Sequence, residues 1–372
     1  MPGCPTGRGN VISTTAQRRT HRTAAAIEQY VSGRRALVTG VVFLLEAAQH
    51  REAVLGVARP GDTIIVPAAG CSDGDEVARA GVTVIGYDGS WRGSGDRMML
   101  DGHHGLALQD YAALTSVSVV EPTVVRFSSA AGLELFLGDA DAARSSGVFV
   151  DPLLDGSVLL DSRATLVDPR EGTAALVRVH VTTTGEYRDG ADGLLLGRAG
   201  ATREAIEALA ASGAGRGRAF AGIVDGGDLE AALDARPWLA RYLAAVELLR
   251  EWGRAYGLVA ISGFGGHLVT ALDHYDELPA IAVATAPFLV AGVDEEFLLI
   301  DQSGRRRFRL DATEARAVEC VIATGEEFAA SALLAAELGR RTRAVDAVVQ
   351  HVLTRFAAVG LDLTAFAARE TT

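Results

Sequence analysis

Lysine is absent from this chain of 372 residues, and all 35 of its basic residues are arginines. Lysine is the side chain that forms Schiff bases with carbonyl compounds. Arginine cannot replace it in this role, because a guanidinium does not deprotonate in proteins. The composition therefore excludes chemistry in which an aldehyde cofactor is tethered to a side chain of this protein.

Cysteine is also scarce, and its three positions are Cys4, Cys71 and Cys320. No Cys-x-x-Cys pair occurs, which argues against a zinc site and against a framework of disulfides.

Residues 1–23 are polar and have no apolar run of the kind found in a secretion signal. The apolar stretch at 280–292 is too short and too interrupted to span a membrane. We therefore expect a cytoplasmic protein that binds no membrane.

Acidic residues (47) outnumber basic ones (35), which gives a formal net charge of −12. Free-standing nucleic-acid-binding proteins are usually basic, so we expect no nucleic-acid partner. The hydrophobic fraction of 49% is enough for a large core. The length suggests about two domains, or one large domain with a smaller appendage.

Helices and strands alternate through the first two thirds of the chain. Apolar residues at helical spacing predict a helix over 43–57, and an apolar run predicts a buried strand over 63–67. A further strand is expected over 148–151, ending in Asp151, and a helix over 202–211 with Thr202 as its cap. This alternation predicts an α/β domain with a mostly parallel sheet that is covered on both faces.

The pattern changes after Gly257, where short strands alternate with helices. We expect a strand over 318–322 and a helix over 278–290 in this part. The predicted organisation is an N-terminal arm (1–30), a large α/β domain (31–256) and a small α+β domain (257–372).

The order of several short segments resembles the fold-type-I pyridoxal phosphate family, and most closely its aromatic amino acid β-eliminating lyases, tryptophanase and tyrosine phenol-lyase. The resemblance covers about residues 31–330. The segments that carry it are Arg59-Pro60-Gly61-Asp62, Gly147-Val148-Phe149-Val150-Asp151, Ala191-Asp192-Gly193, Gly265-Gly266-His267, Leu278-Pro279-Ala280 and Phe308-Arg309-Leu310. The resemblance implies an aspartate-aminotransferase-like large domain and a smaller α+β domain.

The chain departs from the family at the positions that hold the cofactor. The family has its Schiff-base lysine shortly after the Ala-Asp-Gly segment, where this chain has Leu194 to Gly200. Apolar residues replace the phosphate-binding loop near Gly40, and Leu154 stands in place of an arginine that contacts the cofactor. We therefore expect no cofactor, and noncovalent pyridoxal or pyridoxamine phosphate is less favoured.

Three arginines are substrate-binding candidates. Arg309 matches the family's arginine that holds the substrate carboxylate, and the alternative is a solvated basic face shared with its neighbours. Arg198 lies in the region that replaces the cofactor lysine, and the alternative is a surface arginine. Arg126 lies near the position of an asparagine that contacts the cofactor in the family.

Two residues are catalytic candidates. Asp151 matches the acid that pairs with the cofactor ring, and the alternative is a helix cap or a loop-ordering acid before Pro152. His267 follows two glycines and could act as a general acid or base. The alternative is a histidine that is simply packed or hydrogen-bonded. No metal site is expected.

The resemblance and its departures predict a degenerate lyase-like protein. It would bind or convert an amino-acid-like substrate without a Schiff base, and we expect a role in specialised bacterial biosynthesis. The alternative is a non-catalytic partner subunit of an active fold-type-I enzyme, so catalysis itself is left open. The family implies a homodimer, or a heteromer with a related subunit.

Overall fold

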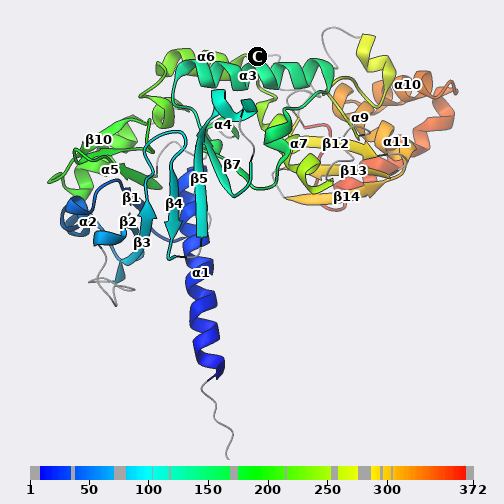
Figure 1. The fold of residues 1–372 in the computed structure, drawn as a ribbon. Coiled ribbons are helices and arrows are strands. Elements are labelled where there is room, and N and C mark those ends of the chain that lie inside the picture. Colours follow the sequence, from blue (N-terminus) through cyan, green and yellow to red (C-terminus); the bar gives the residue numbers. More distant parts are fainter. Residues whose placement is uncertain are drawn as a thin grey trace, which may run out of the picture. The chain divides into compact units, whose positions relative to one another are not determined.

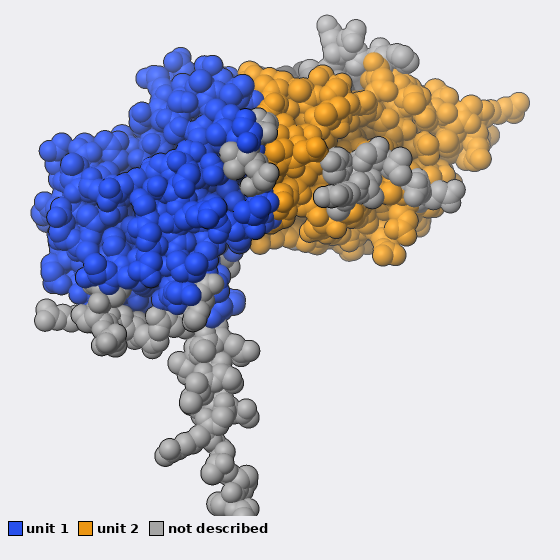
Figure 2. Space-filling view, in the orientation of Figure 1, with its two compact units in different colours: residues 1–135, 157–232 blue, residues 136–156, 233–372 orange. Residues whose placement is uncertain are grey.

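The computed structural model describes residues 9–34, 38–70, 81–102, 104–116, 119–167, 175–213, 216–252, 259–274, 286–293, 296–302 and 305–365. The chain divides into two compact units, shown in Figure 2. Unit 1 comprises residues 1–135 and 157–232, and unit 2 comprises residues 136–156 and 233–372. The second unit is thus larger than the small domain expected over 257–372, because it also includes residues 136–156 and 233–256.

A ten-stranded sheet forms the centre of unit 1 (Figure 1), and its strand order is β10-β9-β8-β1-β2-β3-β4-β5-β6-β7. Five of its nine pairings are parallel, which confirms the predicted α/β class with a mostly parallel sheet. Its strands are β1 (Val42–Leu45), β2 (Thr63–Pro67), β3 (Thr83–Gly89), β4 (Arg97–Leu100), β5 (His104–Asp110), β6 (Thr123–Arg126), β7 (Val158–Leu160), β8 (Arg178–Val181), β9 (Glu186–Arg188) and β10 (Leu195–Arg198).

This sheet is strongly curled. Strands β8 and β7 are seven spacings apart in the sheet order, which would be roughly 34 Å in a flat sheet. Yet Arg178 of β8 forms an ion pair of 2.9 Å with Asp161, which directly follows β7. Arg178 and Ser162, the residue after Asp161, also contact the end of the first helix, since Arg178 donates to the Tyr30 carbonyl and the Ser162 amide donates to the Val31 carbonyl. The sheet therefore bends until β7 returns to β8.

Helices cover both faces of the curled sheet. The concave face packs against the C-terminal half of α1 (Gly9–Ser32), where Ile27 and Tyr30 share a buried cluster with side chains from strands β1 to β6. The other face packs against α2 (Arg51–Val57) and α5 (Arg203–Ser212), which supply Val54 and Ile206 to a second cluster. Unit 1 also contains α4 (Arg163–Val167), while α3 (Ala130–Ser146) and α6 (Gly226–Asp234) contain residues of both units.

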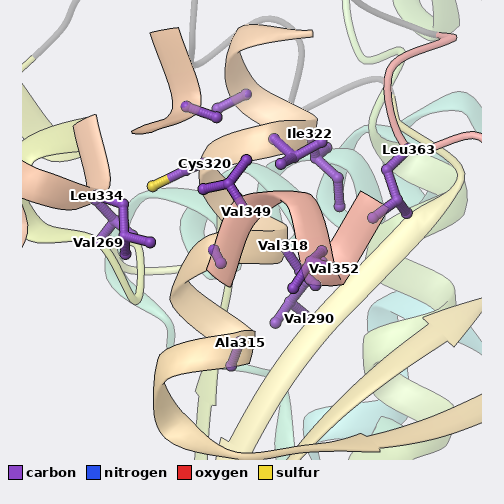
Figure 3. Close-up of a cluster of buried hydrophobic side chains, with 14 of the residues drawn as sticks. Val269, Val290, Ala315, Val318, Cys320, Ile322, Leu334, Val349, Val352 and Leu363 are labelled. Atoms are coloured by element: carbon purple, nitrogen blue, oxygen red, sulfur yellow. The ribbon is translucent and has the colours of Figure 1, made fainter. Parts of the chain in front are cut away.

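Unit 2 contains a four-stranded antiparallel sheet in the order β11-β12-β13-β14. Three helices supply the side chains that bury one face of it, among them Val318, Leu334 and Val352 (Figure 3). Its elements are β11 (Val259–Ile261), β12 (Phe288–Val293), β13 (Glu296–Asp301), β14 (Arg306–Leu310), α7 (Leu239–Trp252), α9 (Ala312–Thr324), α10 (Glu327–Glu337) and α11 (Thr342–Ala357).

Two predicted elements have the wrong type. The helix expected over 43–57 is a strand at β1 followed by a 3₁₀ turn and α2. The strand expected over 318–322 is the second half of α9. Residues 43–45 are a short, fully buried apolar run, and 318–322 is buried and mostly apolar; short buried segments of this kind carry no period that separates strand from helix.

Other predictions differ at the ends of elements. Residues 148–150 form no strand, and Asp151 begins the 3₁₀ helix η5 (Asp151–Leu154). The expected N-terminal arm is largely the helix α1. The helix expected over 278–290 lies mostly outside the described residues, and its last three residues belong to β12. Within the described part of the chain, no helix is long and apolar enough to cross a membrane.

Candidate functional site

A pocket in unit 2 is lined by the end of β12, the start of β13 and the end of β14, and strand alternation explains how Arg309 reaches it. Phe308 and Leu310 of β14 point into the core against α9, together with Phe297 of β13. Because successive side chains of a strand point to opposite faces, Arg309 points to the other face. Its cross-strand partner Leu298 lies on that face too.

The pocket has a volume of about 510 Å³, within the range of roughly 300–1,000 Å³ that is usual for small-molecule sites. Apolar side chains, one guanidinium and two carboxylates line it. The lining residues are Trp252, Val293, Glu296, Phe297, Leu298, Arg309, Leu310 and Asp311.

Arg309 differs from its neighbours on β14. Arg306 forms an ion pair with Asp301 and Arg307 forms one with Glu251. Within the described residues, the Arg309 guanidinium has no ion pair and no hydrogen bond, and only its backbone carbonyl accepts a bond from Arg355 at 2.9 Å. Arg309 therefore presents an unpaired cation to the pocket.

The two carboxylates of the pocket differ in their availability. Asp311 caps α9, because its Oδ1 accepts hydrogen bonds of 2.8 Å from the amides of Thr313 and Glu314. Glu314 completes a capping box by accepting the Asp311 amide at 3.2 Å. Glu296 has no such role, since no hydrogen bond of its side chain occurs among the described residues. Glu296 is therefore the acid that can receive a ligand cation.

His267 forms a dyad with the buried Glu319 of α9. The distance from its Nδ1 to Glu319 Oε1 is 3.2 Å, and Glu319 also accepts the amides of Leu268 at 3.1 Å and Val269 at 2.6 Å. A carboxylate that accepts from Nδ1–H leaves Nε2 as the basic nitrogen, which is the arrangement of an oriented general base. His267 does not line the pocket of Arg309, so the structure does not bring these two predicted residues together there.

Asp151 is exposed at the first position of η5, with Pro152 beside it. The prediction that Asp151 ends a strand of the sheet is therefore wrong. Its place in the first turn of a helical segment fits the alternative of an acid that orders a turn.

Arg126 is the end residue of β6 and is buried in unit 1. Its Nε donates to Asp161 Oδ2 at 3.2 Å, and Asp161 Oδ1 accepts from Arg178 at 2.9 Å. Asp189 pairs with both Arg178 and Arg218, so the charges alternate along a buried chain. Burial opposes ionisation of Asp161, but the Arg178 and Arg126 guanidiniums hold its pKa below the usual range.

A second buried chain joins α1, β8 and the end of β1. The Tyr30 hydroxyl lies 2.7 Å from His180 Nδ1, and His180 Nε2 lies 3.0 Å from Glu46 Oε1. Burial lowers the pKa of His180, so the neutral ring accepts from Tyr30 and donates to Glu46. Burial opposes the charge of Glu46, but hydrogen bonds from His180 and the Thr183 amide lower its pKa. Glu46, Arg126 and Asp161 all lie at carboxyl ends of strands, where α/β proteins place ligands.

Arg198 is part of no such cluster. Its side chain is 73% exposed at β10 and pairs with Glu186 at 3.0 Å. This surface pair matches the alternative for Arg198, a surface arginine.

Glu319, Glu46 and the partners of Arg126 were not predicted from the sequence. One signal was present, because Arg178 and His180 interrupt an otherwise apolar strand, and charged residues in such a strand need buried partners. Those partners lie far along the chain, since Tyr30 and Glu46 are 150 and 134 positions from His180.

Among the residues that the structure describes, no cluster of three or more histidine, cysteine or acidic side chains is arranged to hold a metal ion. A scan against protein-family models found no match, and searches of the curated proteins and of the solved structures found none either.

Proposed function

We propose that the protein binds a small amino-acid-like molecule in the pocket of unit 2, with Arg309 holding its carboxylate. The observation that carries this proposal is an arginine without an ionic partner among the described residues, lining a pocket of about 510 Å³. An unpaired guanidinium beside apolar walls favours a ligand with both a negative and an apolar part.

The lining residues suit the three parts of such a molecule. The planar guanidinium of Arg309 can donate two parallel hydrogen bonds to a carboxylate. Glu296 supplies a carboxylate for an ammonium group, and Trp252 with Leu298 supplies apolar surface for a side chain. A pocket that combines apolar walls with few polar groups is typical of small-molecule sites.

The proposal is one of binding, and conversion of the ligand stays a prediction. His267 has the geometry of an oriented base, but it does not line this pocket. Because the chain has no lysine, any conversion would proceed without an imine to a side chain of the protein.

The relationship to the fold-type-I family likewise stays a prediction. An open sheet keeps its outer strands apart, whereas the sheet of unit 1 curls until Asp161 after β7 reaches Arg178 of β8. Binding at Arg309 depends only on unit 2 and does not require an aminotransferase-like unit 1.

The test is a thermal-shift screen of the proteinogenic amino acids, followed by affinity measurements on the Arg309→Gln variant. A hydrogen bond to a charged group contributes about 1.5–3 kcal/mol, so we expect the variant to bind about 10- to 100-fold more weakly. The control is Arg343→Gln, which removes an exposed arginine of α11. Equal affinities of Arg309→Gln and the wild type would contradict the proposal. A screen in which no amino acid shifts the unfolding temperature would favour the partner-subunit alternative.

A further inference from the structure

Unit 1 contains a small cavity at the carboxyl end of β6, separate from the proposed site. Its volume of about 10 Å³ is room for roughly one water molecule. The lining residues are Arg126, Phe127, Asp161, Ser162, Ala191, Asp192, Ala219 and Phe220. The cavity thus combines a guanidinium and two carboxylates with two aromatic rings.

Arg126 has far fewer partners than a buried guanidinium requires. The residue is 6% exposed, and a guanidinium has five N–H donors. Its only hydrogen bond within the described residues runs from Nε to Asp161, while Nη2 is buried without a partner. The Asp192 carboxylate lies 3.9 Å from Nε, too far for a hydrogen bond. An acceptor is therefore missing beside Arg126.

A second donor close to Arg126 is also unpaired. The Trp91 Nε1 atom is buried and has no partner among the described residues, and the guanidinium carbon of Arg126 lies 6.0 Å from the centre of the Trp91 ring. Buried polar atoms in folded proteins are nearly always satisfied. Trp91 does not line the cavity, so Arg126 Nη2 is the orphaned donor that points to an acceptor there from outside the chain.

With Asp192 protonated, the charges around the cavity favour an anion over a neutral acceptor. Three guanidiniums form the buried chain, from Arg126, Arg178 and Arg218, but only Asp161 and Asp189 are buried with them. Asp192 is the third carboxylate, and 32% of its side chain is exposed. When Asp192 is protonated, the cluster therefore holds one uncompensated positive charge.

We propose that this cavity binds one small inorganic anion of halide size against Arg126. The size follows from the cavity, which admits about one water-sized sphere. The sign of the charge follows from three guanidiniums facing two carboxylates once Asp192 is protonated, and the rings of Phe127 and Phe220 line the apolar part of the wall. This site does not depend on the proposed function of the pocket in unit 2.

Asp192 couples the anion to pH. The charged and titratable groups around its carboxylate are Arg126, Asp161, His180 and Arg188. Burial raises the pKa of Asp192 above its usual value despite the attraction of Arg126. A bound anion repels the Asp192 carboxylate and raises that pKa further, so binding takes up a proton. Affinity for the anion therefore increases as the pH falls towards this raised pKa, by up to about tenfold per pH unit.

The test uses sodium bromide with the full chain, at constant ionic strength set by sodium sulfate, whose anion is too large for the cavity. We expect bromide to raise the unfolding temperature more at pH 5.5 than at pH 8. A crystal soaked in bromide should show an anomalous scattering peak beside the Arg126 guanidinium.

Two variants separate this site from general salt effects and from the titration of His180. Asp192→Asn keeps His180 but removes the competing carboxylate, so its response to bromide should be strong at both pH values. Arg126→Gln should lose the response, and if it does not fold, Asp192→Asn and the anomalous peak decide the question. A cavity that holds only a water molecule, or a bromide response in Asp192→Asn that is as pH-dependent as in the wild type, would overturn the proposal.

Discussion

Arginine supplies every fixed positive side-chain charge of this protein, and one buried arginine can use several donors at once. Arg178 donates to two backbone carbonyls, to Ser162 and to Asp161, and lies 3.4 Å from Asp189. A lysine has three donors on a single nitrogen and could not span these partners. The sequence showed which arginines interrupt apolar strands, but their partners come from strands and helices far away in the chain. This is why the roles of Arg178 and Arg126 required the structure.

The buried carboxylate of Glu319 is predicted to stabilise unit 2. It is 1% exposed and accepts hydrogen bonds from His267 and from the amides of Leu268 and Val269. Glu319→Gln turns one acceptor into an NH₂ group, which leaves a buried donor facing an amide donor. We expect a loss of about 1–3 kcal/mol in the free energy of unfolding, measured by urea denaturation. Glu326→Gln is the control, because Glu326 is exposed and its side chain makes no cap bond to α10. Equal stabilities of the two variants would contradict this role of Glu319.

At the scale of elements, the sequence predicted those with a clear start signal and a clear period. The helix predicted over 202–211 is α5, and Thr202 caps it by accepting from the Ala205 amide at 3.3 Å. The buried strand predicted over 63–67 is β2. The strand expected over 318–322 was wrong, although Asp311 and Glu314 have the spacing of a capping box that starts α9. Their signal was outweighed by the apolar run that follows.

The Tyr30–His180–Glu46 chain connects three elements and predicts how stability depends on pH. Burial lowers the pKa of His180 below its ordinary value of 6.5, so the unfolded chain binds a proton in a range where the folded protein does not. Stability therefore falls as the pH falls through about 6.5, by at most about 1.4 kcal/mol per pH unit. The Glu46 pKa is also lowered, and its contribution is lost only below its ordinary value of 4.5.

This dependence can be measured by urea denaturation between pH 7.5 and pH 5.5. The variant His180→Gln should be less stable at pH 7.5 but should lose the part of the slope that belongs to His180. His351→Gln serves as control, since the His351 side chain is 63% exposed. An unchanged slope in His180→Gln would show that His180 does not titrate as a buried neutral ring.

At the scale of the molecule, the chain forms two units with separate hydrophobic clusters. An α/β sheet, and a second part in which short strands alternate with helices, could be predicted from the change of pattern near residue 257. The discontinuous boundary could not, because residues 136–156 join unit 2 through contacts such as the stacked rings of Phe149 and Tyr242. The curl of the large sheet could not be predicted from the sequence either, because it depends on pairs of residues far apart in the chain, such as Arg178 and Asp161.

Because the two units have separate hydrophobic clusters, we expect a substitution that destabilises one unit to leave the stability of the other unchanged. Ile27 is 5% exposed in the cluster between α1 and the curled sheet. Ile27→Ala should destabilise unit 1 by about 2–5 kcal/mol. We expect faster amide hydrogen exchange in β1 and β2 but unchanged exchange in α9. Glu28→Ala, at the exposed neighbouring position, is the control. Equal acceleration in α9 would show that the two units open together.

Calorimetric titration with a matched pair of ligands tests the central claim most directly. The pair is the amino acid that gives the largest thermal shift and the amine that results from removing its carboxyl group. If Arg309 holds the carboxylate, the wild type should bind the amino acid at least about tenfold more tightly than the amine. Arg309→Gln should bind both with the same weak affinity. Equal binding of the two ligands by the wild type would contradict the account.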